Sequence, residues 1–109
     1  MPAPQIILAS SSPRRKYLLN ILLGNFGMKV KVQPANISEK LPDNIYKPSV
    51  MVKKLALNKA KFVAEYCKGI IIGADTIVVL NGKVLGKPSS RKDAIKILQL
   101  LSGKIHKVY

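Results

Sequence analysis

The sequence is poor in the residues that build metal centres, disulfides and aromatic platforms. Its 109 residues include one Cys, one His and no Trp. A single cysteine excludes an intrachain disulfide and indicates a reducing compartment. A zinc site needs a cluster of cysteine and histidine ligands, so none is expected. Two Phe and four Tyr are too few to favour a stacking surface for single-stranded nucleic acid.

Long hydrophobic runs are also missing. The longest apolar stretch, 70–80, is interrupted by Asp75 and is well short of the roughly 20 residues of a membrane-spanning helix. The N-terminal segment MPAPQ lacks the basic and hydrophobic parts of a secretory signal. Together with the lone cysteine, these absences predict a cytoplasmic protein that does not enter a membrane.

Acidic side chains are scarce, and the charge balance is strongly positive. Five Asp and Glu stand against nineteen Lys and Arg, which gives a formal net charge of +14. Such an excess predicts attraction to polyanions, including nucleotides and nucleic acid. Sixteen of the nineteen basic residues are Lys, which fits general charge better than base-specific contacts. A compositional bias towards Lys, with most of these side chains on solvated faces, explains the excess equally well.

The pattern of apolar residues predicts a small α/β domain with a mixed sheet flanked by helices. Strands are expected at 6–9, 28–32, 70–74, 76–80, 83–85 and 104–109, helices at 13–23, 49–67 and from the Ser90 cap to 101, and a loop at 34–47. The apolar run 70–74 is typical of a buried central strand. Asn81-Gly82 predicts a tight hairpin. Ser90 with Asp93 predicts a capping box.

The stretch LASSSPRR at 8–15 leads from the first strand into the first helix. Ser12 before Pro13 is typical of an N-cap followed by the first helical residue. Arg14 and Arg15 then fall in the first turn, where positive charge opposes the helix dipole unless an anion lies there. Free backbone N–H groups, hydroxyls and arginines together favour a phosphate site. Ser12 is a cap in either interpretation.

Two charged residues interrupt apolar patterns. Lys59 lies in the middle of the apolar face of the second helix, where it either snorkels to solvent or reaches into a site. Asp75 follows the apolar run 70–74, at a strand end of the kind where ligand crevices form in α/β sheets. It is either a metal ligand or general base, or an aspartate that orders a turn by bonding backbone N–H groups.

The segment Gly86-Lys87-Pro88 has some features of a phosphate loop. It does not match a Walker P-loop, because Pro88 stands where a Ser or Thr must bind magnesium. Lys87 precedes a helix and is still a candidate phosphate contact. Cys67, on the apolar face of the second helix, is expected in the core, and His106 has no partners that indicate a catalytic triad.

Several short blocks agree in order and spacing with a known family. In chain order they are LASSSPRR at 8–15, LA at 55–56 with KA at 59–60, GADT at 73–76, LGKP at 85–88, LSG at 101–103, His106 and Val108. Together they resemble the Maf family of nucleoside triphosphate pyrophosphatases, also called septum-formation inhibitor proteins. The resemblance runs through nearly the whole chain, and it implies a Maf/ITPase-like α/β fold.

The resemblance also implies a reaction and a set of site residues. The reaction is hydrolysis of a nucleoside triphosphate to the monophosphate and pyrophosphate, with Mg²⁺ or Mn²⁺ as cofactor. Asp75 is implied as the catalytic proton acceptor that activates water, and Glu39 with Asp75 as metal ligands. The residues implied in substrate binding are Ser10, Arg14, Arg15, Lys59, Thr76 and Lys87.

The form of two blocks points to one branch of the family. PRR together with GADT resembles the branch that acts on dTTP and UTP, and the branch that acts on 7-methyl-GTP differs at both places. Arg14 and Thr76 are therefore the positions implied in the choice of base. The chemistry is sensible without the family, because attack at phosphorus needs positive charge around the oxygens and an oriented water.

The chain departs from the family in two places. It has Ser38-Glu39 where members usually carry an acidic pair, and it ends at Tyr109 where members continue with further strands and a glutamine-bearing pocket wall. The expectation is one Maf-like domain over 1–109 that lacks the family's C-terminal half. A catalytically inactive basic fragment that binds nucleic acid or nucleotides by charge is the alternative function. A homodimer, or a partner chain that completes the sheet, is a further expectation.

Overall fold

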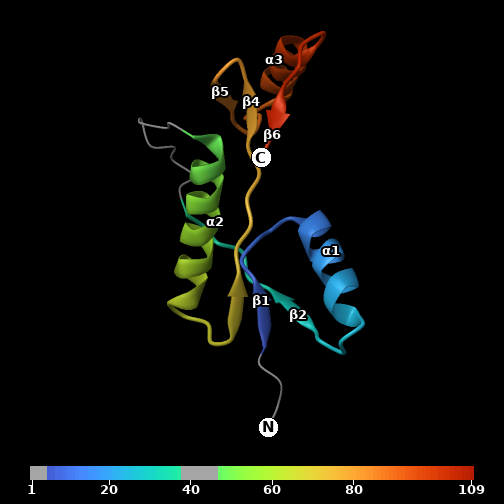
Figure 1. The fold of residues 1–109 in the computed structure, drawn as a ribbon, viewed down its shortest axis with the longest axis vertical. Helices are drawn as coiled ribbons and strands as arrows, with labels where there is room; N and C mark the ends of the chain where they lie inside the picture. Colours follow the sequence, from blue (N-terminus) through green and yellow to red (C-terminus); the bar gives the residue numbers. More distant parts are fainter. Residues whose placement is uncertain (1–4, 38–46) are drawn as a thin grey trace.

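A computed structural model describes residues 5–37 and 47–109. The elements, shown in Figure 1, are β1 (Ile6–Leu8), α1 (Pro13–Gly24), β2 (Val30–Val32), α2 (Pro48–Ala64), β3 (Ile70–Ile72), β4 (Val78–Leu80), β5 (Lys83–Leu85), α3 (Arg91–Leu101) and β6 (Lys107–Val108). The α/β class and the order of elements are confirmed. The helix predicted at 49–67 is shorter, because a turn replaces its last residues.

The first sheet is parallel and has the order β2-β1-β3. Ile7 of β1 is opposite Lys31 on one side and Ile71 on the other. The central strand is therefore β1, whose three residues are all buried. The prediction that 70–74 forms the central strand is wrong, because β3 is an edge of this sheet in the described part of the chain, and Ile70 is 48% exposed.

The second sheet is antiparallel and has the order β5-β4-β6. The predicted hairpin joins β4 to β5, with Asn81 at φ 49° and Gly82 at φ 78°. Positive φ at both central residues is the requirement of a type I′ turn, which an Asn-Gly pair meets at little cost. Strands β4 and β6 also pair, and Ile77 and Tyr109 exchange two backbone hydrogen bonds beside them.

In the described residues, parallel and antiparallel pairing thus occur in two sheets of three strands each. The apolar stretch 70–80 belongs to both, since β3 lies in the first sheet and β4 in the second. The intervening residues, 73–77, are named here the β3–β4 crossover. Figure 1 shows the two sheets at opposite ends of the long axis, with the crossover running between them and α2 alongside.

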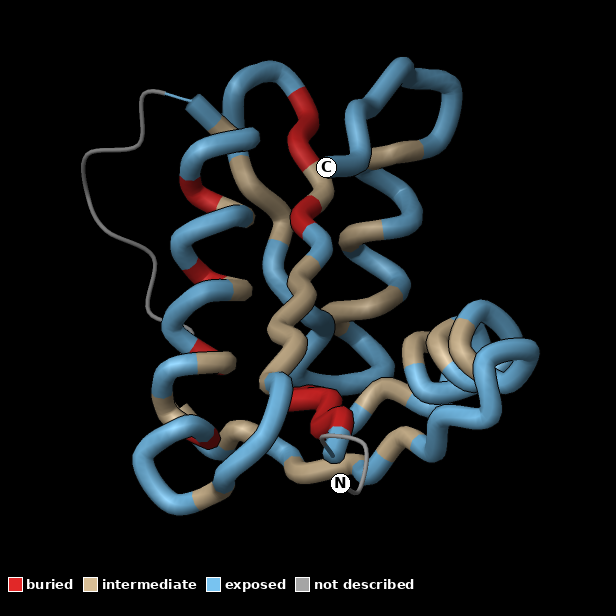
Figure 2. Tube along the Cα trace, turned by 60° about the horizontal axis from the view of Figure 1, so that its bottom comes forward, coloured by how far each residue is buried: buried red, intermediate tan, exposed pale blue. Residues whose placement is uncertain are grey.

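Helix α2 is packed against both ends of the molecule. Toward its N-terminus, Met51 and Leu55 form a buried cluster with Ile77 and Val79. Toward its C-terminus, Val63 forms a second cluster with residues of β1 and the segment after it, and Cys67 packs there as predicted. Figure 2 shows the buried positions recurring along one side of this helix. The helix is therefore the common support of two small cores.

The ends of the other helices are set by side-chain caps. Ser12 accepts a hydrogen bond from the Arg15 backbone N–H, and Ser90 accepts one from Asp93. The predicted capping box is only half present, because the Asp93 carboxylate accepts from Ser89 and not from Ser90. In the described residues, no helix combines the length and the apolar character needed to cross a bilayer.

Candidate functional site

The loop between β1 and α1 holds a buried hydroxyl. Ser10 is 5% exposed, and its Oγ accepts hydrogen bonds from the Ser12 backbone N–H at 3.1 Å and from Arg15 Nη1 at 3.4 Å. Ser12 Oγ in turn accepts from the Arg15 backbone N–H at 3.3 Å. The first turn of α1 has no acidic residue. The loop therefore presents a capped helix N-terminus next to guanidinium charge, which is an arrangement suited to an anion.

A buried ion pair lies between α2 and the β3–β4 crossover. Lys59 Nζ is 3.2 Å from Asp75 Oδ2, and the two side chains are only 9% and 7% exposed. Lys59 therefore does not snorkel to solvent. It occupies the gap between the two apolar clusters, one helical turn from Leu55 and one from Val63. Of the two alternatives left open by the sequence, snorkelling to solvent or reaching inward, the structure shows that Lys59 is directed inward.

The two oxygens of Asp75 have different surroundings. Oδ1 accepts a hydrogen bond of 2.7 Å from the Thr76 backbone N–H, which is the turn-ordering contact that one interpretation expected. Oδ2 is buried and accepts no hydrogen bond from the residues that the structure describes, and Lys59 is its ionic partner. One oxygen thus fixes the carboxyl group, and the other is held toward the interior beside a cation.

Arg15 links the loop after β1 to the crossover after β3. Its Nη2 donates to Thr76 Oγ1 at 3.0 Å, while its Nη1 donates to Ser10 Oγ. A continuous series of contacts therefore runs from Ser10 through Arg15, Thr76 and Asp75 to Lys59. These residues come from three segments that follow or flank the two neighbouring parallel strands β1 and β3. The carboxyl ends of such strands are where ligands bind in open α/β sheets.

Within the part of the chain that the structure describes, three hollows involve these side chains. One of about 120 Å³ is lined by Ser10, Ser12, Arg15, Lys59 and Lys87 together with 34–36. A second of about 520 Å³ is lined by Arg14, Arg15, Asp75, Thr76 and Lys87, among others. Lys87 and Arg14 are exposed at the surface of these hollows.

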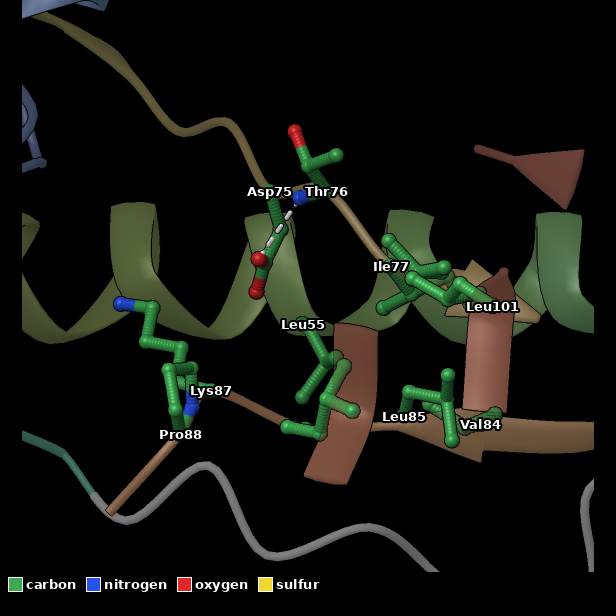
Figure 3. A pocket seen from close by; sticks show the side chains of 12 residues that line it. Leu55, Asp75, Thr76, Ile77, Val84, Leu85, Lys87, Pro88 and Leu101 are labelled. Carbon is green, nitrogen blue, oxygen red and sulfur yellow. Dashed lines mark hydrogen bonds between the residues drawn. The ribbon is translucent and has the colours of Figure 1, made fainter. Parts of the chain in front are cut away.

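The third hollow is mostly apolar. It has a volume of about 320 Å³, and its lining includes Leu55, Val84, Leu101, Asp75 and Lys87. Figure 3 shows the carboxyl group of Asp75 pointing toward the side on which Leu55 and Lys87 lie, while the Thr76 side chain points the other way. The hollow of about 520 Å³, which several cations line, thus adjoins the mostly apolar one, and Asp75 lines both.

The residues present are compatible with a divalent cation that is held by few protein side chains and mainly by a bound ligand and water. In the described part of the chain no three Asp, Glu, His or Cys side chains come together as a metal-binding group. Mg²⁺ is commonly held by one or two carboxylates together with water and phosphate oxygens. The buried Asp75 Oδ2 is such a carboxylate oxygen. Glu39, the other predicted ligand, lies outside the described residues.

The structure brings most of the predicted substrate-binding residues to one place. Ser10, Arg15, Lys59 and Lys87 share one hollow, and Arg14 and Thr76 line the adjoining one. Sequence reasoning missed residues 34–36, which line the smaller hollow and were expected to be only loop. A sequence signal was present in part, because these residues come just after a predicted strand; that the carboxyl end of β2 lies beside that of β1 is known only from the structure.

Comparison with known proteins gives a family and named relatives. Residues 5–109 match the family described as Maf-like protein. The chain is 48% identical over 105 residues to the dTTP/UTP pyrophosphatase of Desulforamulus reducens, covering 95% of this chain and 52% of that protein. It is 42% identical over 103 residues to the dTTP/UTP pyrophosphatase of Thermococcus onnurineus, covering 94% and 53%. The chain thus spans about half the length of these curated relatives.

Proposed function

Because this chain belongs to the Maf-like family, we propose that it acts in the hydrolysis of dTTP or UTP to the nucleoside monophosphate and pyrophosphate. The observation that carries the proposal is the convergence of Ser10, Arg15, Lys59 and Lys87 on one hollow, where Lys59 is ion-paired to Asp75. The names of the relatives, dTTP/UTP pyrophosphatase, support the choice of substrate.

The basic side chains hold the triphosphate. A triphosphate carries several negative charges, and cations fixed around it stabilise the additional charge that develops on its oxygens during attack. Arg15 presents a planar guanidinium suited to two phosphate oxygens, whereas Lys59 and Lys87 act as point charges. The N–H groups at the start of α1 add fixed donors that need no reorganisation.

Asp75 accepts the proton of the attacking water. The oxygen of the water forms a bond to the α-phosphorus. The bond from the α-phosphorus to the oxygen that bridges it to the β-phosphate breaks, and pyrophosphate leaves with the electron pair of that bond. The proton released by the water passes to the Asp75 carboxylate. Lys59 at Oδ2 and the Thr76 N–H at Oδ1 hold the carboxylate in one orientation. A fixed orientation is what a general base needs in order to meet its water.

A divalent cation, Mg²⁺ or Mn²⁺, completes the proposed site. Asp75, together with Glu39 from outside the described residues, would hold it. Bound there, it would neutralise phosphate charge and polarise the phosphorus under attack. Base choice is assigned to Arg14 and Thr76, which line the hollow of about 520 Å³.

The first test is release of pyrophosphate by the 109-residue chain from dTTP, UTP, CTP, ITP and 7-methyl-GTP, with Mg²⁺ or Mn²⁺. We expect release from dTTP or UTP, and loss of that release in Asp75→Asn, which keeps the shape of the side chain but removes the base. Thermal unfolding of Asp75→Asn checks that the fold is retained. Equal activity in the variant would refute the role of Asp75.

A second candidate is binding of nucleic acid by charge, without catalysis. It is favoured by the net charge of +14 and by exposed lysines on the outer face of α2, such as Lys53, Lys54 and Lys61. Binding of this kind weakens steeply as salt rises, because bound counterions are released. Duplex DNA binding with little salt dependence would count against it.

Location and assembly complete the proposal. We place the protein in the cytoplasm, where its nucleotide substrates occur and where a lone free Cys67 remains reduced. A homodimer stays a prediction, and sedimentation of the purified chain at several concentrations tests it.

A further inference from the structure

Gly73 lies where the β3–β4 crossover touches α2. A β-carbon at this position would overlap the carbonyl oxygen of Ala56 and lie 3.0 Å from the β-carbon of Ala60. The first of these neighbours is helix backbone and has no freedom to rotate away. The requirement for glycine here is therefore one of space, because the backbone of the crossover passes in direct contact with the surface of α2.

The point of contact is on the same helical turn as the buried ion pair. Ala56 precedes Lys59 by three residues and Ala60 follows it directly, while Gly73 precedes Asp75 by two. The close approach at Gly73 therefore sets how far the crossover lies from the helix at the place where Asp75 Oδ2 meets Lys59 Nζ at 3.2 Å. It also sets the position of Thr76, and through it the hydrogen bond from Arg15.

We propose that Gly73 is a positioning residue for the site: the absence of its side chain lets the crossover seat against α2 and so places Asp75 on Lys59. A methyl group at 73 moves the crossover away from the helix by about the size of the overlap it would create. An error of about 1 Å in the position of a catalytic group costs on the order of 100-fold in rate. The expected effect of Gly73 on catalysis rests on the proposed function, whereas its effect on the placement of Asp75 does not.

Other glycines provide a matched comparison. A β-carbon at Gly24 would meet no atom within 4 Å, and the φ of Gly24 is not positive. Gly24→Ala therefore makes the same chemical change at the end of α1 without steric conflict. If Gly73→Ala acts only by reducing backbone freedom, it should have the same effect on Lys59 as Gly24→Ala. If it acts by displacing the crossover, the two variants should differ.

The deciding experiment does not need activity. Trace acetylation of lysines, read by mass spectrometry, compares Lys59 with Lys61, which is exposed on the same helix. In the starting chain Lys59 reacts slowly, since it is buried and ion-paired. In Gly73→Ala we expect its reactivity relative to Lys61 to rise about five-fold or more, with no change in Gly24→Ala. An unchanged ratio in a folded Gly73→Ala chain would overturn the proposal.

Activity gives the second readout. If the starting chain releases pyrophosphate, Gly73→Ala should lower kcat about 10- to 100-fold and change KM less, because the crossover that carries Asp75 moves while Arg15 and Lys59 stay anchored on α1 and α2. Equal losses in kcat and in the fraction of folded protein would point to a merely structural role and refute positioning. If no nucleotide is hydrolysed by the starting chain, the proposed function fails, and the acetylation ratio still decides the role of Gly73.

A second variant applies if Gly73→Ala does not fold. Ala60→Val adds two methyl groups on the helix side of the same contact and leaves the crossover sequence unchanged. The expected result is again a raised reactivity of Lys59 relative to Lys61. A ratio equal to that of the starting chain in folded Ala60→Val would then overturn the proposal.

Discussion

Helix α2 differs from α1 and α3 in what it buries. Four of its seventeen residues are buried, namely Met51, Leu55, Lys59 and Val63. Neither α1 nor α3 has a buried residue, and large apolar side chains such as Leu22 of α1 and Leu98 of α3 are about two-thirds exposed, at 65% and 66%. Helix α2 therefore stabilises the fold through buried side chains. Helices α1 and α3 have no buried residue, and the contacts at their N-termini are side-chain caps.

The difference locates the site. The buried residues of α2 follow at intervals of four, and one of them is charged. Three apolar members join the two cores, and Lys59 falls between them, where the carboxylate of Asp75 offers it a charge of opposite sign. Helix α1, in contrast, contributes its N-terminus and Arg15. The site thus combines the interior of one helix with the exposed start of another.

Replacing the buried lysine should have the largest effect. Lys59→Met keeps the length of the side chain but leaves the Asp75 carboxylate buried without its cation. Loss of one partner of a buried pair typically costs about 3–5 kcal/mol. Urea unfolding monitored by circular dichroism measures the change, and Lys61→Met on the exposed face is the control. A loss below about 1 kcal/mol would mean that the pair is open to solvent, contrary to the structure.

Two valines of α2 test the packing contribution next. Val63 is 0% exposed and Val50 is 59% exposed. Removing two methyl groups from the interior, with some residual cavity, predicts a loss of about 2 kcal/mol for Val63→Ala. Val50→Ala should change the free energy of unfolding by no more than about 0.5 kcal/mol. Similar values for the two variants would show that the second core is not formed.

The start of α1 should respond moderately. Ser12→Ala removes the acceptor of the Arg15 backbone N–H, and loss of such a cap typically costs about 1 kcal/mol. Ser12→Asn, which is also a good cap, should restore most of the stability. Thermal unfolding compares the three chains. An Ala variant as stable as the original would mean that the helix does not depend on its cap.

The outer surface of α1 should respond least. Leu22 is 65% exposed, so Leu22→Ala should alter the free energy of unfolding by about 0.5 kcal/mol or less. The same urea titration that serves for Lys59→Met provides the measurement. A loss as large as that of Val63→Ala would show that α1 is packed against something in solution, and the contrast between the helices would then disappear.

The sequence singled out residues that the structure brings together, but not the contacts between them. Lys59 and Asp75 were each singled out because a charge interrupted an apolar pattern, but nothing in the pattern paired them with each other. The contact between Arg15 and Thr76 joins residues 61 positions apart and was likewise invisible. In the sequence Gly73 is only one member of the GADT motif, because the need for glycine arises from the nearby surface of α2 and not from its own backbone conformation.

The sequence by itself determined the features that depend on neighbouring residues. The order of strands and helices, the Ser12 and Ser90 caps and the Asn81-Gly82 hairpin follow from local sterics and hydrogen bonding, which a short segment contains in full. The tertiary structure decided that β1 and not β3 is central, that stretch 70–80 is shared by two sheets, and that Lys59 lies on Asp75. Those outcomes depend on which segments, far apart in the sequence, pack against each other. The sequence of one segment does not specify which other segment will bury it.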